Sequence, residues 1–327
     1  MTNCYIISGG TGFVGNNLVR ELERQGVNNI VVQARSEKKV EESLQGTNAK
    51  VVYGTIMNAD DLDKLFSEAQ SPIIFVHTAS VVYLGGDKKR LEHMYDTNIE
   101  GTRNVIEACL KYGARLVYVS SVHSIPKAKK GKIVKEVCSF DPKKVKGHYA
   151  KTKAIASQMV LDAVRNDGLD AILVHPSGIS GPNDFTGTYL GQMVEDYRAG
   201  RIPVAVKGGY DFVDVRDVVA GIISVSKNAE RGSCYLLTNK FYSVRQVLDI
   251  LHELGVGKRV KRTLPIWVAW FGLPFYSMYA KAGKKRPLYT KYSLRTLGEN
   301  SNFSYEKANN ELGYSPRELK DSLRDMI

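Results

Sequence analysis

The chain has 327 residues, which is enough for one large α/β domain with or without a smaller lobe. Lysine and arginine number 46 against 34 aspartates and glutamates, so the formal net charge is +12. The basic runs 127–132 and 281–286 are not interleaved with stacking aromatic residues, so we expect no nucleic-acid partner. The cysteines form no C-x-x-C pair, and we expect free thiols rather than disulfides or metal ligands at Cys4, Cys109, Cys138 and Cys234.

The first motif is an apolar run at residues 5–8 that ends in a glycine cluster and leads into an amphipathic segment at 16–24. This order predicts the strand, turn and helix of a dinucleotide site. Gly9 permits the tight turn, Gly12 lets the backbone approach a pyrophosphate, and Gly15 lets the helix pack close to the strand. A purely structural loop is the alternative, but the position directly after the first strand favours nucleotide binding.

The second strand, at residues 29–35, ends without the acidic residue that accepts hydrogen bonds from the ribose hydroxyls of NAD. Ala34 stands at that position and Arg35 follows, with Ser36 and Lys38 close behind. A guanidinium group can pair with a 2′-phosphate through two parallel hydrogen bonds, so this strand end favours NADP(H) as the cofactor. A surface arginine at a strand end is the alternative interpretation of Arg35.

Three more apolar runs, at 50–54, 72–77 and 115–119, are expected to be strands, with helices at 59–69 and 89–112. Strands that alternate with helices at this spacing predict an α/β fold with a parallel, doubly wound Rossmann sheet. Ligands of such sheets bind beyond the carboxyl ends of the strands. Small residues that would let a cofactor pass close by follow the fourth strand: Thr78, Ala79 and Ser80.

A helix that begins near His148 carries Tyr149 and Lys153, which are four positions apart and therefore share one face. An ammonium group beside a phenol lowers the pKa of the phenol, which would make Tyr149 a proton donor or acceptor near neutral pH. Ser121, at the end of the fifth strand, could hydrogen-bond the oxygen that changes charge during hydride transfer. Taken alone, a Y-x-x-x-K pair also fits an ordinary amphipathic helix.

Together these motifs resemble the extended short-chain dehydrogenase/reductase family, within the NAD-dependent epimerase/dehydratase superfamily, over essentially the whole chain. The resemblance implies that Tyr149 is the catalytic acid/base and that Lys153 lowers its pKa while holding the nicotinamide ribose. It further implies that Ser121 polarises the substrate oxygen, with Ser120 as the alternative. Asn98 matches the asparagine in the family's helix after strand four, an organiser of water or backbone.

The cofactor contacts are likewise implied by the resemblance. Residues 174–182 are similar to the R-P-x-x-V-x-G-P segment that contacts the nicotinamide amide, although His175 replaces the usual arginine. Thr55 and Ile56 stand where the family often has Asp-Leu, and Thr55 can still make one hydrogen bond to the adenine. The implied cofactor-binding residues are Gly9, Thr11, Gly12, Phe13, Val14, Gly15, Arg35, Thr55, Ile56, Thr78, Ala79, Ser80, Ser120, Tyr149, Lys153, Pro176, Ser177 and Ile179.

For the domain organisation, we expect residues 1–182, joined by about 212–240, to form the NADP-binding Rossmann domain. We expect about 183–211 and 241–327 to form a smaller, mostly helical C-terminal substrate lobe. Within the lobe, helices are predicted at 188–201 and at 244–254.

Asp214 and Asp217 admit two interpretations, paired catalytic carboxylates or a helix cap with an ion pair to Arg216, and the second is favoured. Ser243 is predicted to cap the helix that follows it.

The segment 264–279 is rich in aromatic residues, which could form the lobe core, line an apolar pocket beneath a lid, or touch a membrane surface. The basic run 281–286 supports the membrane alternative. The segment is too short to span a bilayer and contains Pro265 and Pro274, so no stable membrane insertion is expected. This arrangement and the Arg35 strand end look most like the dihydroflavonol-reductase and 3β-hydroxysteroid-dehydrogenase branch of the family.

The function predicted from these features is an NADP(H)-dependent oxidoreductase that interconverts a ketone and a secondary alcohol on an apolar polycyclic or aromatic substrate. One alternative is a nucleotide-sugar epimerase or dehydratase, whose sugar-diphosphate contacts could come from Arg198, Arg201, Arg216 and Arg295. A non-catalytic NADP-sensing regulator is the other alternative, and the presence of both Tyr149 and Lys153 disfavours it.

The first strand begins almost at Met1, so we expect no signal peptide and a cytoplasmic location. The helices at 89–112 and 148–166 could pair with their copies in a homodimer.

Overall fold

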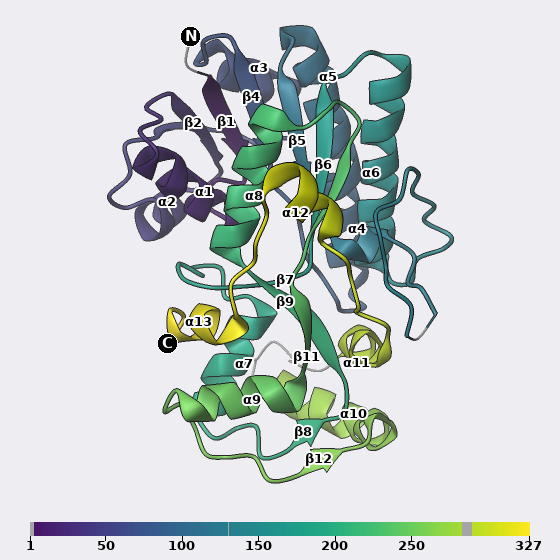
Figure 1. Ribbon diagram of the computed structural model, residues 1–327. Helices are drawn as coiled ribbons and strands as arrows, with labels where there is room; N and C mark the ends of the chain where they lie inside the picture. The colour runs from purple at the N-terminus through teal and green to yellow at the C-terminus, as the bar shows by residue number, and fades with distance from the viewer. Residues whose placement is uncertain (1–2, 130, 283–289) are drawn as a thin grey trace.

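A computed structural model describes residues 3–129, 131–282 and 290–327, with the backbone alone at 275–282. The larger part of the molecule is built on a seven-stranded sheet in which all neighbouring strands are parallel (Figure 1). In spatial order the strands are β10 (Cys234–Leu237), β6 (Ala171–Pro176), β5 (Arg115–Val119), β4 (Ile73–His77), β1 (Cys4–Ser8), β2 (Ile30–Ala34) and β3 (Lys50–Tyr53). This is the doubly wound Rossmann order, so the expected fold class is confirmed.

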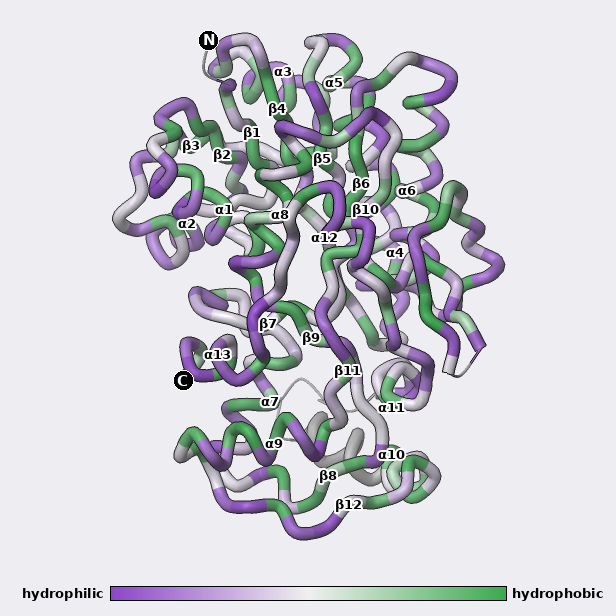
Figure 2. Tube along the Cα trace, in the orientation of Figure 1, coloured by the Kyte–Doolittle hydropathy of each residue, from purple (hydrophilic) through white to green (hydrophobic). Residues whose placement is uncertain are grey.

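The main sheet is buried on both faces because its strands carry apolar residues on both sides. In β1, Cys4 and Ile6 belong to one hydrophobic core, whereas Tyr5 and Ile7 belong to the other, as the alternation of side chains along a strand requires. Figure 2 shows the central strands largely green between helices of mixed colour. The first core is covered by α3 (Ala59–Ser67), α5 (Gly101–Tyr112) and α6 (His148–Asn166), and the second by α1 (Phe13–Arg24), α8 (Val215–Asn228) and α12 (Glu306–Leu312).

Two local features of this part differ from the sequence-based expectations. A short helix, α2 (Glu37–Ser43), follows β2 and was not expected. The single helix expected at 89–112 is divided into α4 (Lys88–Tyr95), a π-helical stretch η1 (Asp96–Glu100) and α5. A π-helical turn widens the helix locally, and such turns are frequent at functional sites. Here the widened turn carries Asn98.

The smaller lobe combines short strands with helices. Its three-stranded sheet contains β7 (Gly178–Ser180), β9 (Gly209–Asp214) and β11 (Lys240–Ser243), and a second pair contains β8 (Ala205–Val206) and β12 (Thr263–Leu264). Apolar side chains of three helices fill the main lobe core. These helices are α7 (Tyr189–Arg198), α9 (Val244–Glu253) and α13 (Leu319–Arg324). Ser243 caps α9 with a complete capping box, as predicted.

The C-terminal segment returns to the main sheet before it ends in the lobe. Helix α12 packs against α8 and β10, and Ala308 is fully buried in the core beneath α1 and α8. The range 241–327, expected to belong wholly to the lobe, therefore includes a helix that covers the Rossmann sheet. The final helix, α13, then packs against α9 and β9.

The favoured interpretation, a helix cap with an ion pair to Arg216, is confirmed for Asp214, whereas Asp217 pairs with Arg317 instead. Asp214 caps α8 by accepting a hydrogen bond from the backbone N–H of Arg216 at 2.8 Å, and its carboxylate also accepts one from that guanidinium at 2.7 Å. The Asp217 carboxylate accepts hydrogen bonds from the backbone and the guanidinium of Arg317, at 2.8 and 3.0 Å. Both carboxylates therefore stabilise the junction of β9, α8 and the C-terminal segment.

The aromatic segment forms helix α10 (Ile266–Ala282), with Pro274 inside it. Trp267 and Phe271 are 62% and 76% exposed, so the alternative that the aromatics of this segment form the lobe core fails for both. The molecule has a cavity of about 600 Å³ between the main sheet and the lobe, and none of the described residues from 264 to 274 lines it. The pocket alternative therefore fails over that range. Across the described residues, no helix combines the length and the hydropathy needed to cross a membrane.

Candidate active site

The turn between β1 and α1 is so close-packed that glycine is required in it. A Cβ on Gly15 would lie 2.3 Å from the carbonyl oxygen of Gly9, and one on Gly9, whose φ is +73°, would lie 2.7 Å from the backbone of Ala79. Gly12 is the N-cap of α1 and makes no side-chain cap, and the first turn of α1 contains no acidic residue. The positive end of α1 is therefore available to an anionic group such as a pyrophosphate.

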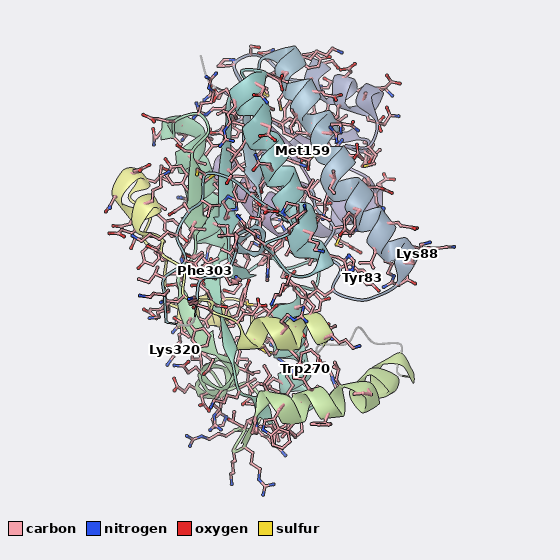
Figure 3. All side chains as sticks on the ribbon, turned by 90° about the vertical axis from the view of Figure 1, so that its right-hand side faces the viewer. Tyr83, Lys88, Met159, Trp270, Phe303 and Lys320 are labelled. Carbon is pink, nitrogen blue, oxygen red and sulfur yellow. The ribbon has the colours of Figure 1, made fainter. Side chains whose placement is uncertain are left out.

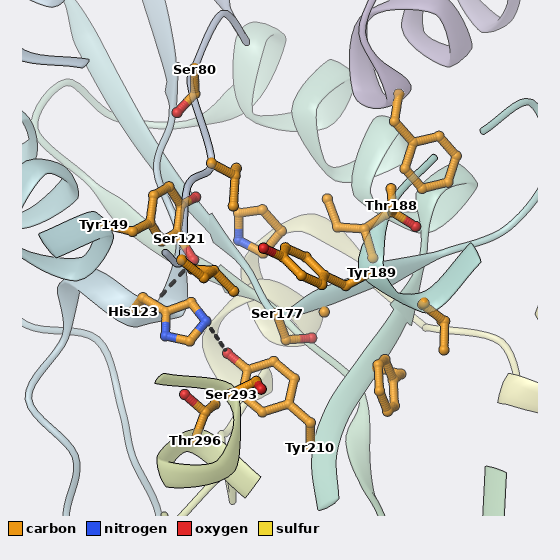
Figure 4. Close-up of a pocket in the computed structure, with 18 of the residues that line it drawn as sticks. Ser80, Ser121, His123, Tyr149, Ser177, Thr188, Tyr189, Tyr210, Ser293 and Thr296 are labelled. Atoms are coloured by element: carbon orange, nitrogen blue, oxygen red, sulfur yellow. Dashed lines mark hydrogen bonds between the residues drawn. The ribbon is translucent and has the colours of Figure 1, made fainter. Parts of the chain in front are cut away.

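A cavity of about 600 Å³ lies beyond the carboxyl ends of the central strands, with the lobe forming its other wall. In Figure 4, Tyr149, Ser121 and His123 stand on one side of it, and Thr188 and Tyr189 stand on the other. The structure brings these sequence-predicted residues together around the cavity: Gly12, Phe13, Val14, Thr78, Ser80, Ser120, Ser121, Tyr149, Lys153, Pro176, Ser177 and Ile179.

The other expected residues do not line this cavity: Gly9, Thr11, Gly15, Arg35, Thr55, Ile56, Ala79 and Asn98. Gly9, Gly15 and Ala79 shape the turn instead. Arg35 is exposed directly after β2, and the backbone N–H of Thr55 donates a hydrogen bond to Asp61 at 2.9 Å.

Tyr149 and Lys153 both lie on α6 and are both buried, but the expected effect of Lys153 on Tyr149 is not found. Burial raises the pKa of Tyr149 to about 12, and the neighbour that lowers it is the Ser121 hydroxyl. The Lys153 ammonium instead donates to the carbonyl oxygen of Val119 at 2.9 Å and lies over the Tyr118 ring. Burial also lowers the pKa of Lys153 to about 7. The prediction of a lowered Tyr149 pKa was wrong because burial disfavours the charged phenolate, and this effect exceeds the lowering by the Ser121 hydroxyl.

The two serines at the end of β5 have different surroundings. The Ser120 hydroxyl is 2.7 Å from the Ser157 hydroxyl on α6 and 3.4 Å from that of Ser124, both buried. The Ser121 Oγ accepts a hydrogen bond from the His123 backbone N–H at 3.3 Å and lies beside Tyr149. Of the two hydroxyls, that of Ser121 is therefore better placed to act together with Tyr149.

Asn98 organises backbone behind the cavity. Its amide nitrogen donates to the Val81 carbonyl at 3.0 Å and to the Thr152 hydroxyl at 3.1 Å, and its oxygen accepts from the Val81 N–H at 2.8 Å. The side chain thus ties the segment after β4 to α6. These bonds match the backbone-organising role that the sequence resemblance implied for Asn98.

His123 is a cavity residue that was missed from the sequence. Its Nε2 is 2.8 Å from the Tyr210 hydroxyl, its Nδ1 is 2.9 Å from the Tyr292 hydroxyl, and its ring meets that of Tyr149 edge to face at 5.9 Å. Burial, reinforced by the Lys127 charge, lowers the pKa of His123 to about 3. The ring is therefore neutral, with one donor and one acceptor for the two tyrosines. Its place two residues after Ser121 was the available sequence signal.

A family model described as the NAD dependent epimerase/dehydratase family matches residues 5–237. The chain belongs to this family. A Synechocystis protein, named only provisionally as a dihydroflavonol 4-reductase, is 30% identical over 100% of this chain and 94% of its own. A 3beta-hydroxysteroid-dehydrogenase/decarboxylase (isoform 1) of Arabidopsis thaliana is 26% identical over 95% of this chain and 75% of its own. The family and branch expected from the motifs are thereby confirmed.

Among solved structures, that of gox2253 is 28% identical, covers 99% of this chain and 96% of its own, and has a TM-score of 0.83. Because the match covers nearly the whole chain, the two structures are alike in the lobe as well as in the Rossmann sheet.

The cavity of this family member is mainly apolar. Among the described residues that line it, Lys153 alone carries a formal charge, since His123 is neutral. The lobe contributes mostly aliphatic and aromatic side chains: Tyr189, Leu190, Met193, Tyr210, Phe212, Val244, Val247, Tyr292 and Leu297. The four arginines considered for sugar-diphosphate contacts lie elsewhere, and three are paired with carboxylates.

His175, which replaces the family arginine, is buried behind the cavity. Its Nδ1 lies 3.2 Å from the Ser124 hydroxyl and 3.3 Å from the carbonyl oxygen of Ser121, and its ring stacks on Phe140. Burial lowers its pKa to about 4, so it is neutral and supports the loop that carries Ser121.

Proposed function

We propose that this family member is an NADP(H)-dependent oxidoreductase that interconverts a ketone and a secondary alcohol on an apolar polycyclic or aromatic substrate. The observation that carries the proposal is the cavity, where Tyr149, Ser121 and Lys153 lie at the sheet end and the rest of the described lining is uncharged. The names of the relatives, a dihydroflavonol 4-reductase and a 3β-hydroxysteroid dehydrogenase/decarboxylase, agree with such a substrate.

In this proposal Tyr149 transfers the proton at the substrate oxygen and Ser121 donates a hydrogen bond to the same oxygen. A bound nicotinamide would supply or accept the hydride. Because its pKa is about 12, Tyr149 holds its proton at neutral pH, which suits the acid in ketone reduction. Lys153, one helical turn further along α6, lines the same cavity, where it would hold the nicotinamide ribose.

The turn after β1 and the open end of α1 are the features that fit a dinucleotide, because no side chain caps or neutralises them. For the choice between NAD and NADP, the proposal depends on Arg35. Its guanidinium is exposed directly after β2, where the strand ends in Ala34 rather than an acid. That position suits a ribose 2′-phosphate, which a guanidinium can bind through two hydrogen bonds.

A nucleotide-sugar epimerase remains the competing function within this family. It would have to bind a diphosphate in the lobe, and the apolar lobe wall offers no arginine or lysine for it among the described lining residues. Arg198, Arg201 and Arg216 are engaged by Glu195, Asp196 and Asp214 respectively. The apolar lining therefore favours the oxidoreductase.

The test is the loss of reduced-nicotinamide absorbance with NADPH and NADH in parallel. The substrates are steroid ketones, flavanonols, aryl ketones and aldehydes, with a UDP-sugar assayed separately for epimerisation. NADPH consumption with an apolar ketone is the expected result. Isomerisation of the sugar without net consumption would replace the proposal by the epimerase.

A further inference from the structure

Helix α10 lies at the surface of the lobe, yet it is apolar on more than one face. Ile266, Ala269 and Leu273 form one stripe along the helix and pack against apolar residues of β8 and of α11 (Lys291–Gly298). A surface helix usually turns polar residues outward opposite such a stripe. The described part of α10 does not follow this rule.

The outward residues of α10 are aromatic. Trp267, Trp270 and Phe271 are 62%, 37% and 76% exposed, and the rings of Trp267 and Phe271 meet edge to face at 6.2 Å. Single exposed apolar residues are common on proteins, but clustered aromatics on one turn of helix are typical of a contact surface. We call these three residues the aromatic face.

A basic loop, residues 258–262, leads through β12 directly into α10. Its cations are all exposed: Lys258, Arg259, Lys261 and Arg262. In the described parts of the chain none of them forms an ion pair, and two carboxylates of α9, Asp249 and Glu253, are already paired with other basic residues. Figures 1 and 3 place β12 and α10 at the end of the lobe farthest from the main sheet, where nitrogen-tipped side chains project outward in Figure 3.

We propose that this end of the lobe docks shallowly on an anionic lipid surface. Tryptophan and phenylalanine rings favour the head-group region of a bilayer, and lysine and arginine pair there with lipid phosphates. The aromatic face and the basic loop supply both kinds of contact at one end of the molecule. The contact is at head-group depth and requires no membrane-spanning helix.

A second copy of this chain fits the same surface poorly. A two-fold interface uses the same patch on both partners, and because residues 258–274 contain no Asp or Glu, neither copy would offer a carboxylate to the basic loop of the other. Like charges at such an interface cost binding energy. An anionic lipid surface instead provides the opposite charge to the basic loop and an apolar layer for the aromatic face.

The inference uses only residues 258–274 and is independent of the proposed oxidoreductase function. The basic run at 281–286 lies outside the residues whose side chains are described and carries no part of it. The docking surface adjoins the active site structurally, because α11 packs against α10 and also contributes Tyr292 and Leu297 to the cavity lining.

Tryptophan fluorescence tests the proposal directly, because the only two tryptophans of the chain are Trp267 and Trp270. Purified full-length protein is titrated with vesicles of phosphatidylcholine alone or mixed with phosphatidylglycerol, and binding is checked by co-sedimentation. We expect a blue shift and co-sedimentation with the anionic vesicles, weakened by added salt. Phosphatidylcholine alone should give much weaker binding.

Three variants identify the surface, and each keeps both tryptophans. Phe271→Ser should weaken the partition to anionic vesicles by about tenfold, since it removes one exposed ring. In the double variant Lys261→Gln with Arg262→Gln, each lost cation should weaken the partition to anionic vesicles by about fivefold. The two losses together should therefore weaken that partition by more than about tenfold. Tyr53→Ser, which removes an exposed aromatic residue on β3 of the main sheet, is the matched control and should bind normally. Circular dichroism verifies that all three variants fold.

The proposal is overturned if neither vesicle shifts the emission, or if Phe271→Ser binds as well as the wild type. A blue shift that grows with protein concentration in the absence of vesicles would assign the surface to a second copy. A shift with soluble polyglutamate but none with anionic vesicles would assign it to an acidic protein partner.

Discussion

The ring of Tyr292 lies against the backbone of Gly147, two residues before Tyr149. A Cβ on Gly147 would be 2.1 Å from Cε2 of Tyr292, whose hydroxyl is 2.9 Å from Nδ1 of His123. Gly147 also has φ +100° and ψ 149°, a backbone conformation restricted almost entirely to glycine. Through Tyr292, the lobe helix α11 therefore contacts two segments beside the proposed acid/base, one at His123 and one at Gly147.

Gly147→Ala should destabilise the protein and reduce turnover, because the added methyl group meets Tyr292 and strains the backbone before α6. We expect the free energy of unfolding to fall by roughly 2–4 kcal/mol. Gly168→Ala is the matched control, since Gly168 also has a positive φ, +76°, but no atom within 4 Å of an added Cβ. Urea unfolding of both variants makes the comparison, and equal losses would show that Tyr292 does not crowd position 147.

Tyr149→Phe should bind NADPH almost normally and lose most of its turnover. Removal of a positioned proton donor costs roughly 10²–10⁴ in rate, whereas the ring itself is kept. Tyr292→Phe is the control within the same cavity, because it loses a hydroxyl that contacts His123 rather than the reacting oxygen. Steady-state kinetics and a fluorescence titration with NADPH separate the two effects. Near-wild-type turnover in Tyr149→Phe would exclude it as the acid.

Arg35→Ala should weaken NADPH binding far more than NADH binding. Loss of a charge-assisted pair with the 2′-phosphate should raise the Kd for NADPH at least about tenfold, while that for NADH changes by less than about twofold. Arg324→Ala, at an exposed arginine paired with Asp321 on α13 of the lobe, controls for the loss of one positive charge. A similar change for both cofactors would remove Arg35 from the 2′-phosphate site.

Buried histidines should make the free energy of unfolding fall as the pH is lowered from 6.5 towards 4. Burial lowers the pKa of His77 and His123 to about 3 and that of His175 to about 4, from an ordinary value of 6.5. Over this range the unfolded chain binds protons that the folded chain does not, so acid favours unfolding. The pKa of Asp211, raised by burial to about 6, acts in the opposite direction between pH 6 and 3.8 and offsets part of the slope.

His175→Gln should reduce this slope by up to roughly 1.4 kcal/mol per pH unit, because it removes one of the three titrating groups. Urea unfolding measured at a series of pH values from 4 to 7 gives the slope for each protein. His252→Gln, at an exposed histidine on α9, is the control and should leave it unchanged. An unaltered slope in His175→Gln would mean that His175 does not resist protonation in the folded protein.

The first five strands of the main sheet were predictable because each is a contiguous apolar run followed by a turn, so local sequence determines the local structure. β5, for example, begins and ends at the expected residues 115 and 119. The glycine turn and the spacing of Tyr149 and Lys153 were predictable for the same reason. In each of these motifs, the residues that carry the signal lie within a few positions of one another in the sequence.

The lobe wall of the cavity was not predictable in this way. His123 meets Tyr210 and Tyr292 across separations of 87 and 169 residues, and no local pattern encodes such contacts. The direction of the Tyr149 pKa shift depends on burial, which the spacing of Tyr149 and Lys153 does not reveal. The sequence could not decide whether Trp267 and Phe271 are buried or exposed, because hydropathy shows which residues avoid water but not whether the fold buries them.

The repeated return of the chain between its two parts has a consequence for how this enzyme scaffold can diversify. After β6 the chain enters the lobe, returns for α8 and β10, enters the lobe again, returns for α12 and ends in the lobe with α13. No single crossover between two genes could exchange the lobe as a module. Replacement of single wall residues on α7, β9 and α11 changes the cavity lining directly and leaves the interlaced backbone intact, so it is the simplest route to a new specificity in such a scaffold.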